Sequence, residues 1–424
     1  MKVLLIGSGG REHALAWKIS QSPRLSELYI APGNGGTQDL GQNVSIPSSQ
    51  IEDLVKFACE QKIDLVVVGP ELPLVQGIAD QLANHGIACF GPNQFAAQLE
   101  GSKSFAKEIM LKTGVPTAAF KVFDHLDAAL RYVQEQNFPL VIKADGLAAG
   151  KGVSIVHDFE QAKRVLIQLM EEKIFGPAGE KVVIEEALTG EEASFLAFCA
   201  GNEVKYLPSS QDHKRIGNND TGPNTGGMGA YSPAPILPDD QMEAIGDLVI
   251  KPIITYLEKQ GHPFTGILYA GLMFTPQGPK VLEYNVRFGD PECQPLMVRL
   301  DSDLLEIMLA CTQGKLANVE LKVKPETALS VVLAAKGYPQ NYPKGMLIQG
   351  LENVPEDVIV FHAGTKQENG KYYTTGGRVL NVTALGQDLP EAKAKAYQAV
   401  KQIYFENMYF RTDIGDKGIK KMSA

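Results

Sequence analysis

The sequence predicts a multidomain protein of mixed class, α/β in its first part and α+β in the rest. Three observations support this prediction. The chain has 424 residues, which is too long for one ordinary hydrophobic core. Short apolar runs alternate with helical patterns over roughly the first hundred residues, and strand-like segments are grouped together after them.

The first 102 residues have the pattern of a parallel sheet with helices on its faces. Each apolar run is short and leads into glycine or proline, and a segment with helical periodicity follows. This alternation predicts a doubly wound parallel sheet, and we place the α/β domain at residues 1–102. The predicted strands are residues 2–6, 28–31, 65–69 and 88–91, and the clearest helices are residues 51–61 and 74–85.

The pattern changes over residues 103–323. A helix is predicted at residues 105–113, and a series of β-patterned segments follows, which favours an α+β region over a continued parallel sheet. Residues 218–235 are rich in Gly, Asn and Pro, and a loop of this length is usually functional or disordered. The predicted strands are residues 138–144, 152–156, 182–185, 193–200, 266–274 and 280–285.

Residues 324–424 form a third predicted region, a C-terminal α+β domain. Strands are expected at residues 329–335 and 379–383. A closing helix is expected across residues 391–406.

Composition excludes several classes of protein. The net charge of −9 argues against a nucleic-acid partner, so anionic ligands must be held by local groups such as glycine-loop amides and placed lysines. The five cysteines are scattered without a C-x-x-C pair, which indicates a reducing compartment. The first residues lack a signal-peptide core and no apolar stretch approaches a membrane span. We therefore expect a cytoplasmic protein with no membrane partner.

The first motif is Gly-Ser-Gly-Gly-Arg-Glu-His at residues 7–13. Glycines between a strand and a helix let backbone N–H groups approach an anion. A dinucleotide fingerprint would need glycine where Glu12 stands, and Arg11 suits a single phosphate group. A tight turn without a ligand is the alternative.

The second motif, residues 141–153, carries Lys143 at the end of a strand and Lys151 at the end of a small-residue loop. Such a loop can fold over triphosphate oxygens while the two ammonium groups offset their charge. It is not a Walker A loop, because Gly152 replaces the Ser or Thr that would bind magnesium. A bare hairpin is the alternative.

A third motif, residues 183–192, follows another strand and is acidic. Its backbone could hydrogen-bond an adenine edge, and a later carboxylate could accept bonds from ribose hydroxyls. An acidic surface turn has the same pattern.

In the fourth motif, Glu283, Asn285 and Arg287 share one face of a strand if that strand extends far enough. A carboxylate and a carboxamide offer the hard oxygens that magnesium prefers. The arginine could bind a carboxylate or a transferring phosphoryl group. A solvated strand face is the alternative, and it fits poorly with Leu282 and Tyr284 on the opposite side.

The fifth motif combines Asp212 with a glycine loop at residues 224–231 that includes Gly226. Aspartate could receive an ammonium group, and the loop could close over a small substrate. A polar surface loop is the alternative. For His213 we expect an orienting or structural role.

Together these stretches resemble the ATP-grasp superfamily and, within it, the phosphoribosylamine–glycine ligase family. The most specific segment is Arg-Phe-Gly-Asp-Pro-Glu-Cys-Gln at residues 287–294. The resemblance extends from residues 7–13 to Gly-Gly-Arg-Val-Leu at residues 376–380. One feature departs from many members of the superfamily, since the strand at residues 266–274 carries no second metal-binding acid. The number of metal ions therefore stays open.

The resemblance implies an ATP-grasp fold for residues 103–323, with a mobile lid at about residues 120–190, and a sugar-phosphate site in residues 1–102. It also implies roles for single residues. ATP would contact Lys103, Lys143, Gly146, Gly150, Lys151, Gly152, Glu185, Glu186, Leu188 and Glu192. The other substrates would contact Gly9, Gly10, Arg11, Glu12, Asp212, Gly226 and Arg287, with Asp212 and Arg287 as the catalytic residues. Magnesium or manganese would bind Glu283 and Asn285.

The implied reaction joins glycine to 5-phosphoribosylamine at the expense of ATP, through glycyl phosphate, in purine biosynthesis. We expect a monofunctional, monomeric enzyme with small-molecule substrates. The nearest alternative is another ATP-grasp ligase or carboxylase. A nicotinamide-dependent oxidoreductase is suggested only by the first motif, and a catalytically inactive nucleotide-binding regulator is disfavoured by the complete set of lysines and metal-binding groups.

Overall fold

The N-terminal residues form a five-stranded parallel sheet in the order β3-β2-β1-β4-β5. The structure is a computed structural model that describes residues 1–148 and 151–423. Val3 and Leu5 of β1 pack in one hydrophobic core, while Leu4 and Ile6 pack in another. Both faces of the sheet are therefore buried, which confirms the predicted doubly wound arrangement. The strands are β1 (Lys2–Gly7), β2 (Glu27–Pro32), β3 (Gln42–Asn43), β4 (Leu65–Val68) and β5 (Ala88–Phe90), and the helices are α1 (Gly10–Ile19), α2 (Ile51–Glu60), α3 (Glu71–Val75), α4 (Ile78–Asn84) and α5 (Gln94–Gly101).

The single helix predicted at residues 74–85 is wrong. The segment holds the end of α3 and all of α4, with Gly77 between them at φ +84°. That left-handed conformation suits glycine and interrupts a right-handed helix.

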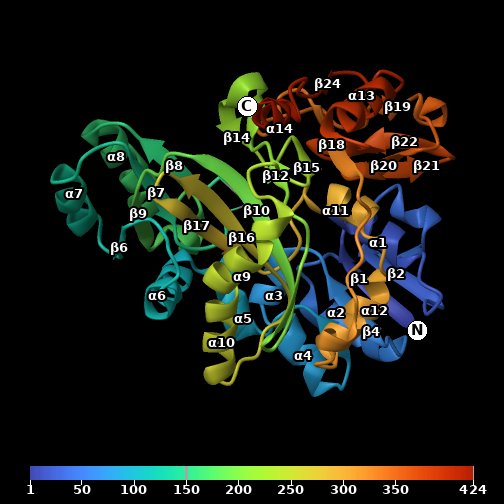
Figure 1. Ribbon diagram of the computed structural model, residues 1–424, viewed down its shortest axis with the longest axis horizontal. Coiled ribbons are helices and arrows are strands. Elements are labelled where there is room, and N and C mark those ends of the chain that lie inside the picture. Colours follow the sequence, from blue (N-terminus) through green and yellow to red (C-terminus); the bar gives the residue numbers. More distant parts are fainter. Residues whose placement is uncertain (149–150, 424) are drawn as a thin grey trace.

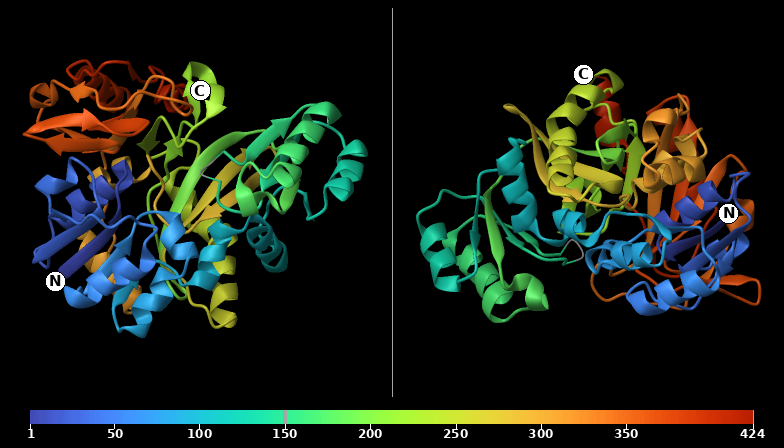
Figure 2. Two further views of the ribbon diagram at one scale, coloured as in Figure 1. Left: turned by 180° about the vertical axis from the view of Figure 1, so that it is seen from behind. Right: turned by 90° about the horizontal axis from the view of Figure 1, so that it is seen from below.

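A second sheet, antiparallel and four-stranded, lies in a projecting lobe in the order β6-β9-β7-β8. Figure 1 shows this lobe in teal and green at one end of the molecule, and the views of Figure 2 show that it extends away from the rest. Helix α6 lies where the lobe joins the remainder of the chain. The elements are α6 (Lys103–Thr113), β6 (Phe120–Phe123), α7 (Leu126–Gln134), β7 (Leu140–Ala144), β8 (Val153–Val156), α8 (Phe159–Leu166) and β9 (Val182–Glu186).

A third sheet, in the order β11-β10-β16-β17, occupies the centre of the molecule. Leu268 of β16 shares a core with Leu4 of β1, so this sheet is packed directly onto the N-terminal residues. The elements are β10 (Glu191–Ala200), β11 (Glu203–Tyr206), α9 (Met242–Val249), α10 (Lys251–Lys259), β16 (Thr265–Thr275), β17 (Gly278–Asn285), α11 (Cys293–Arg299) and α12 (Leu304–Thr312).

The C-terminal sheet runs in the order β12-β15-β18-β23-β20, with β24 also paired to β18. Two of its strands, β12 and β15, precede residue 233 in the sequence. Strand β15 lies within residues 218–235, so this segment is not simply a loop. This part of the molecule also has a two-stranded sheet, β13-β14, and a three-stranded sheet, β19-β22-β21. The strands are β12 (Gln211–Asp212), β13 (Arg215–Gly217), β14 (Thr221–Asn224), β15 (Gly229–Ser232), β18 (Thr327–Ala335), β19 (Leu347–Ile348), β20 (Val358–His362), β21 (Thr365–Glu368), β22 (Lys371–Thr374), β23 (Arg378–Gly386) and β24 (Met408–Tyr409).

The predicted closing helix at residues 391–406 is also corrected. Helix α13 spans Leu389–Val400, and a further helix, α14 (Asp416–Met422), ends the described chain. Asp388 caps α13 by accepting a hydrogen bond from the Glu391 N–H, which explains its early start. Among the helices of residues 1–148 and 151–423, none is long and apolar enough to cross a membrane.

The blue N-terminal and red C-terminal parts of the chain lie next to each other, and the central sheet separates them from the projecting lobe (Figures 1 and 2). Strand ends and loops from all of these parts therefore meet in one region. The candidate site lies there.

Candidate active site

A cavity of about 2310 Å³ is lined by residues from the lobe, the central sheet, the N-terminal helices and the C-terminal strands. We call it the main cleft. Most of the residues singled out in the sequence meet in its wall. These are Arg11, Lys103, Lys143, Lys151, Gly152, Glu185, Glu186, Leu188, Glu192, Asp212, Gly226, Glu283, Asn285 and Arg287.

Glu283 and Asn285 lie two residues apart near the end of β17 and both line the cleft. Strand alternation places them on one face, as expected. Burial opposes ionisation of Glu283, but Lys214, Lys143 and Lys103 outweigh it and hold the pKa of this carboxyl below its usual value. A carboxylate and an amide oxygen are a suitable pair for a hard divalent cation whose other ligands are phosphate oxygens and water. No group of three or more His, Cys, Asp or Glu side chains arranged for a metal occurs within the described residues.

Strand β17 ends at Asn285, yet Arg287 stays with the other two side chains. Its Nη2 lies 3.2 Å from the Asn285 Oδ1, and the guanidinium is paired with two carboxylates from N-terminal helices. The Glu100 Oε1 lies 2.6 Å from Nη2, and the Glu71 Oε2 lies 3.4 Å from Nε. Burial raises the pKa of Glu100 to about 7, although Arg287 opposes the rise. Sequence reasoning missed both glutamates, because nothing in their local sequence distinguishes them from other helical carboxylates.

Two lysines, Lys103 of α6 and Lys143 of β7, also line the cleft. The Lys103 Nζ donates to the Gly146 carbonyl at 3.0 Å. The Lys143 Nζ lies 2.9 Å from Glu185 Oε2 and donates to the Leu282 carbonyl at 3.2 Å. Burial lowers the pKa of Lys103, and Glu283 opposes this shift. The Lys143 ammonium group thus contacts β17 next to Glu283, and both lysines lower the pKa of the Glu283 carboxyl.

The predicted nucleotide-pocket residues Glu186, Leu188 and Glu192 also line the main cleft. Glu186 accepts hydrogen bonds from the Ala119 N–H at 3.0 Å and from Lys280 Nζ at 2.9 Å. Leu188 lines the cleft with its apolar side chain. Glu192 pairs with Lys214 at 3.1 Å.

The loop after β7 connects the lobe with two other parts of the molecule. The Asp145 carbonyl accepts from the Lys103 N–H at 2.9 Å, and Lys151 Nζ lies 3.5 Å from the Pro339 carbonyl in the C-terminal part. At Gly146, which is outside the cleft lining, a Cβ would lie 2.9 Å from the Ala178 side chain. The predicted contact at Gly150 lies outside the described residues.

Asp212 ends the short strand β12 and faces the cleft. Burial raises the pKa of its carboxyl to about 8, and Lys214 opposes the rise. His213 next to it is buried, with Nδ1 3.3 Å from the Gly229 carbonyl.

The glycine-rich loop before α1 is divided between two cavities. Arg11 lines the main cleft, whereas Ser8 and Gly9 line a second cavity of about 370 Å³, which we call the side pocket. Asn34, Thr365 and Gly376 belong to its wall as well. Asp290 and Arg378 line both cavities and so mark the place where the two meet.

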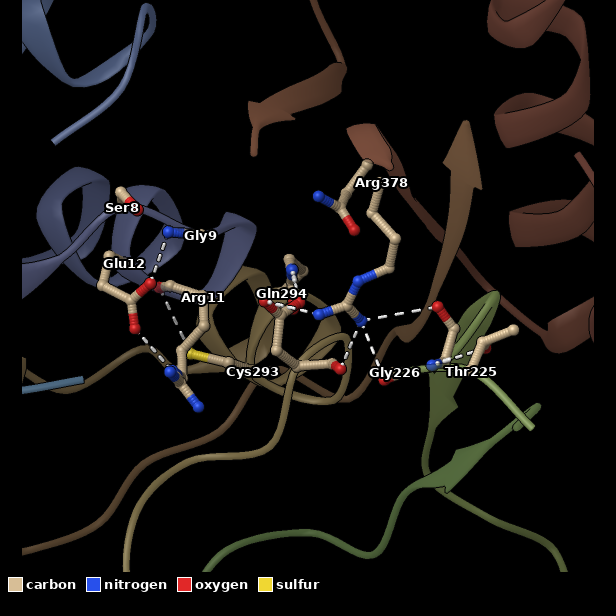
Figure 3. A network of polar contacts seen from close by, with 12 residues as sticks. Ser8, Gly9, Arg11, Glu12, Thr225, Gly226, Cys293, Gln294 and Arg378 are labelled. Carbon is tan, nitrogen blue, oxygen red and sulfur yellow. Dashed lines mark hydrogen bonds and ion pairs between the residues drawn. The ribbon is translucent and has the colours of Figure 1, made fainter. Parts of the chain in front are cut away.

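Within the described chain, Gly10 and Glu12 line neither of these two cavities, and their contact with a substrate stays a prediction. The Glu12 carboxylate is 2 % exposed because it turns back onto its own loop. It accepts from the Gly9 N–H at 2.5 Å and pairs with the Arg11 Nε at 2.5 Å. Figure 3 shows this arrangement. Glu12 therefore holds the loop and Arg11 in place.

The sequence singled out Arg378 only as part of the segment at residues 376–380. In the structure its side chain connects two segments of the site. Its Nη1 donates to the Gly226 carbonyl at 2.8 Å and to the Asp290 carbonyl at 2.6 Å, and its Nη2 lies 3.2 Å from Asp290 Oδ2 (Figure 3). Arg11 Nη1 donates to the Phe288 carbonyl at 3.0 Å. The turn at residues 287–292 is thus held by one arginine from the N-terminal part and one from the C-terminal part.

Comparison with known proteins agrees with this geometry. Three family models described as phosphoribosylglycinamide synthetase match the chain: the N domain at residues 1–100, the ATP-grasp (A) domain at residues 101–293 and the C domain at residues 328–417. The phosphoribosylamine–glycine ligase of Rhizobium meliloti (strain 1021) is 50 % identical over 424 residues, with 100 % of both chains covered. That of Vibrio vulnificus (strain CMCP6) is 50 % identical over 425 residues, with 99 % of each chain covered.

Solved structures give the same result for the fold. The crystal structure of the phosphoribosylamine–glycine ligase of Thermotoga maritima matches with a TM-score of 0.85 and 35 % identity, covering 98 % of this chain and 100 % of the other. Biotin carboxylase from Campylobacter jejuni, in complex with an ATP analogue, matches with a TM-score of 0.75 over 100 % of this chain and 95 % of its own. Its 15 % identity shows a shared fold alone.

Proposed function

The chain belongs to the phosphoribosylglycinamide synthetase family, and from this membership we propose that it is an ATP-dependent ligase that joins glycine to 5-phospho-D-ribosylamine. The products are N1-(5-phosphoribosyl)glycinamide, ADP and phosphate. The reaction belongs to purine biosynthesis.

One observation supports the proposal most directly. Glu283, Asn285 and Arg287 line the main cleft together with Lys103 and Lys143, and both lysines lie close enough to Glu283 to lower the pKa of its carboxyl. Two lysines suit a triphosphate, and the arginine suits a carboxylate or a transferring phosphoryl group. This is the arrangement that phosphoryl transfer from ATP to a carboxylate requires.

The first step activates glycine. A carboxylate oxygen attacks the γ-phosphorus of ATP, the bond to the bridging oxygen breaks, and ADP leaves with that electron pair. Lys103 and Lys143 stabilise the phosphate charge. Asp212, once deprotonated, holds the glycine ammonium group and Arg287 orients the carboxylate, because a reacting oxygen must be held near its target.

The second step forms the amide. The amine of phosphoribosylamine attacks the carbonyl carbon of glycyl phosphate, loses a proton, and phosphate leaves. An acyl phosphate hydrolyses in water, so the loop after β7 protects it when it closes over the cleft. The ion-dipole contact of Lys151 with Pro339 indicates where the loop meets the C-terminal part.

Magnesium is the metal that fits the site best, held by Glu283 and Asn285. The oxygen ligands suit it, and the lysines that keep Glu283 ionised leave the carboxylate ready to coordinate. Held by these two residues, the ion would neutralise charge on the ATP phosphates. Manganese accepts the same ligands.

Phosphoribosylamine fits a path from the side pocket to the main cleft. Its phosphate group suits the pocket wall formed by Ser8 and Gly9, close to the Arg378 guanidinium. Its amine then reaches the cleft past Asp290, which lines both cavities.

The decisive experiment measures ADP release with each substrate omitted in turn. We expect release only when ATP, glycine and phosphoribosylamine are all present. ADP release with bicarbonate or D-alanine in their place would contradict the proposal and indicate another ATP-grasp activity. Tight NAD binding without a thermal shift on adding ATP would contradict it in favour of an oxidoreductase.

We also propose that the enzyme works as a monomer in the cytoplasm. The five cysteines are free thiols in the described structure, and three of them, Cys199, Cys293 and Cys311, are buried, which agrees with a reducing compartment. Light scattering coupled to size-exclusion chromatography tests the monomer. A mass of twice 45.9 kDa would contradict it.

A further inference from the structure

A buried lysine that the proposed reaction does not use lies next to the nucleotide site. Lys107 is four residues after Lys103 on α6, so both side chains leave the helix on the same face. Lys107 is 2 % exposed and lines the main cleft. Its Nζ lies 3.0 Å from Glu185 Oε1 and donates to the Thr117 Oγ1 at 2.6 Å.

Glu185 connects this lysine to a second one. Its other oxygen, Oε2, lies 2.9 Å from the Lys143 Nζ, and the carboxylate is 2 % exposed. One buried carboxylate is thus shared by two buried ammonium groups. Burial lowers the pKa of Lys107 to about 8, with Glu185 opposing the shift, so the ammonium group is charged at neutral pH. Two lysine side chains and one glutamate side chain thus meet beside the cleft.

The shared carboxylate has a consequence for Lys143. If Glu185 had Lys143 as its one partner, moving that ammonium group toward a phosphate would leave a buried carboxylate unpaired. Burying a carboxylate without a partner is unfavourable. With Lys107 in place, Glu185 keeps a partner whichever way Lys143 turns. The hydroxyl of Thr117, which donates to the Val281 carbonyl at 2.6 Å, accepts a hydrogen bond from Lys107 and helps to hold it in place.

We propose that Lys107 is a positioning residue for ATP, which keeps Glu185 paired so that Lys143 can turn to the nucleotide phosphates. The inference rests on the proposed function only in placing Lys143 at ATP. Lys107 acts through Glu185, whereas Lys143 touches the nucleotide.

The test compares Lys107→Met, Glu185→Gln and the variant that carries both changes. The measured quantity is the affinity for Mg-ATP, obtained by calorimetry in the absence of glycine and phosphoribosylamine. Lys107→Met makes Lys143 the one partner of Glu185, and we expect ATP affinity to fall about tenfold, equivalent to about 1.4 kcal/mol. Adding Glu185→Gln removes the carboxylate that retains Lys143. We expect the double variant to bind ATP within about threefold of Glu185→Gln alone.

The kinetic signature separates positioning from loss of structure. Lys107→Met is expected to raise the KM for ATP while leaving the KM for glycine within about twofold of the native value, because the change acts on one substrate. The matched control is Lys173→Met, which removes a lysine from an exposed ion pair with Glu180, 3.0 Å long, in the same lobe. Its ATP affinity and unfolding temperature are expected to stay unchanged.

Two outcomes would overturn the proposal. One is native ATP affinity in a folded Lys107→Met variant. The other is an equal loss of ATP affinity when Lys107→Met is made in the Glu185→Gln background, since Lys107 would then act on ATP directly. If Lys107→Met alone does not fold, the ATP affinities of the double variant and of Glu185→Gln alone still test whether Lys107 acts through Glu185. Absence of ligase turnover with ATP binding intact would count against the proposed function and not against this inference.

Discussion

Glu283 is surrounded by cationic side chains, and this environment determines what the residue can do. Lys103, Lys143 and Lys214 hold its pKa down despite burial, so the carboxylate is ionised at neutral pH. An ionised carboxylate next to the amide oxygen of Asn285 is the form that binds a divalent cation.

Glu283→Gln keeps the shape of this side chain and removes its charge. We expect the KM for Mg-ATP to rise and kcat to fall about 100-fold, because a metal ligand and the charge that balances the lysines are both lost. The unfolding temperature should stay within a few degrees of the native value. Steady-state kinetics over a range of magnesium concentrations tests this, and native kinetics would remove Glu283 from the metal site.

Asp212 gives a prediction about pH. Its pKa is raised to about 8 by burial, so below pH 8 the carboxyl is mostly neutral and cannot attract the glycine ammonium group. As the pH rises toward 8 the carboxylate forms and glycine binding improves. We expect kcat/KM for glycine to increase up to about tenfold per pH unit below pH 8 and then to level off. A flat profile between pH 6.5 and 8.5 would refute this, and Asp212→Asn is expected to remove the rise.

At the scale of elements, α11 depends on one buried arginine at its C-terminal end. Arg299 is 4 % exposed and donates from Nε to the Glu326 carbonyl at 2.7 Å, and from Nη1 to the Ser232 Oγ at 2.8 Å. The side chain thereby links α11 to β15 and to the chain that leads into β18.

Arg299→Met should destabilise this junction by about 3 kcal/mol, because buried acceptors lose their donor. The measurement is the shift of the urea unfolding midpoint. The control is Arg24→Met, which removes an exposed pair with Glu306 at 3.4 Å and is expected to cost less than about 0.5 kcal/mol. Equal effects of the two variants would show that the Arg299 contacts contribute little.

Elements with a clear hydrophobic period were predicted well, and those set by glycine or by distant partners were not. Strands such as β16 and β17 are apolar enough to be recognised locally. Strand β15 lies in a segment rich in Gly and Pro, and its pairing with β18 is made by residues about a hundred positions away. The helix break at Gly77 escaped notice because a single glycine is also tolerated inside a helix.

At the scale of the whole molecule, Arg378 joins the C-terminal sheet to the reactive region. It begins β23 and holds both the Gly226 loop and the turn at Asp290. Because Asp290 and Arg378 line both cavities, a shift of the C-terminal part would change the path between them.

Arg378→Met is expected to lower kcat/KM for phosphoribosylamine about 100-fold, since small misplacements of reacting groups have effects of this size. The KM for ATP should change less than about threefold, because Arg378 makes its contacts with Gly226 and Asp290 and not with the two lysines. Arg378→Lys should recover part of the loss, because the positive charge is kept. The recovery should be incomplete, because one ammonium group cannot make all of the contacts of a guanidinium. A rise in the KM for ATP as large as the loss of kcat/KM for phosphoribosylamine would contradict this. The control is Lys366→Met, which removes an exposed ion pair with Glu368.

The sequence by itself determined the class of the fold, the parallel N-terminal sheet, the family and a set of site residues most of which line the main cleft. These features depend on local patterns, namely the hydrophobic period, glycine-rich turns and a segment such as residues 287–294. Tertiary structure alone decided that Glu71 and Glu100 hold Arg287, that Glu12 serves its own loop, and that Lys107 shares Glu185 with Lys143. The physical reason is that a buried charge must find a partner, and the partner is chosen by distance in space, which separation along the chain does not reveal.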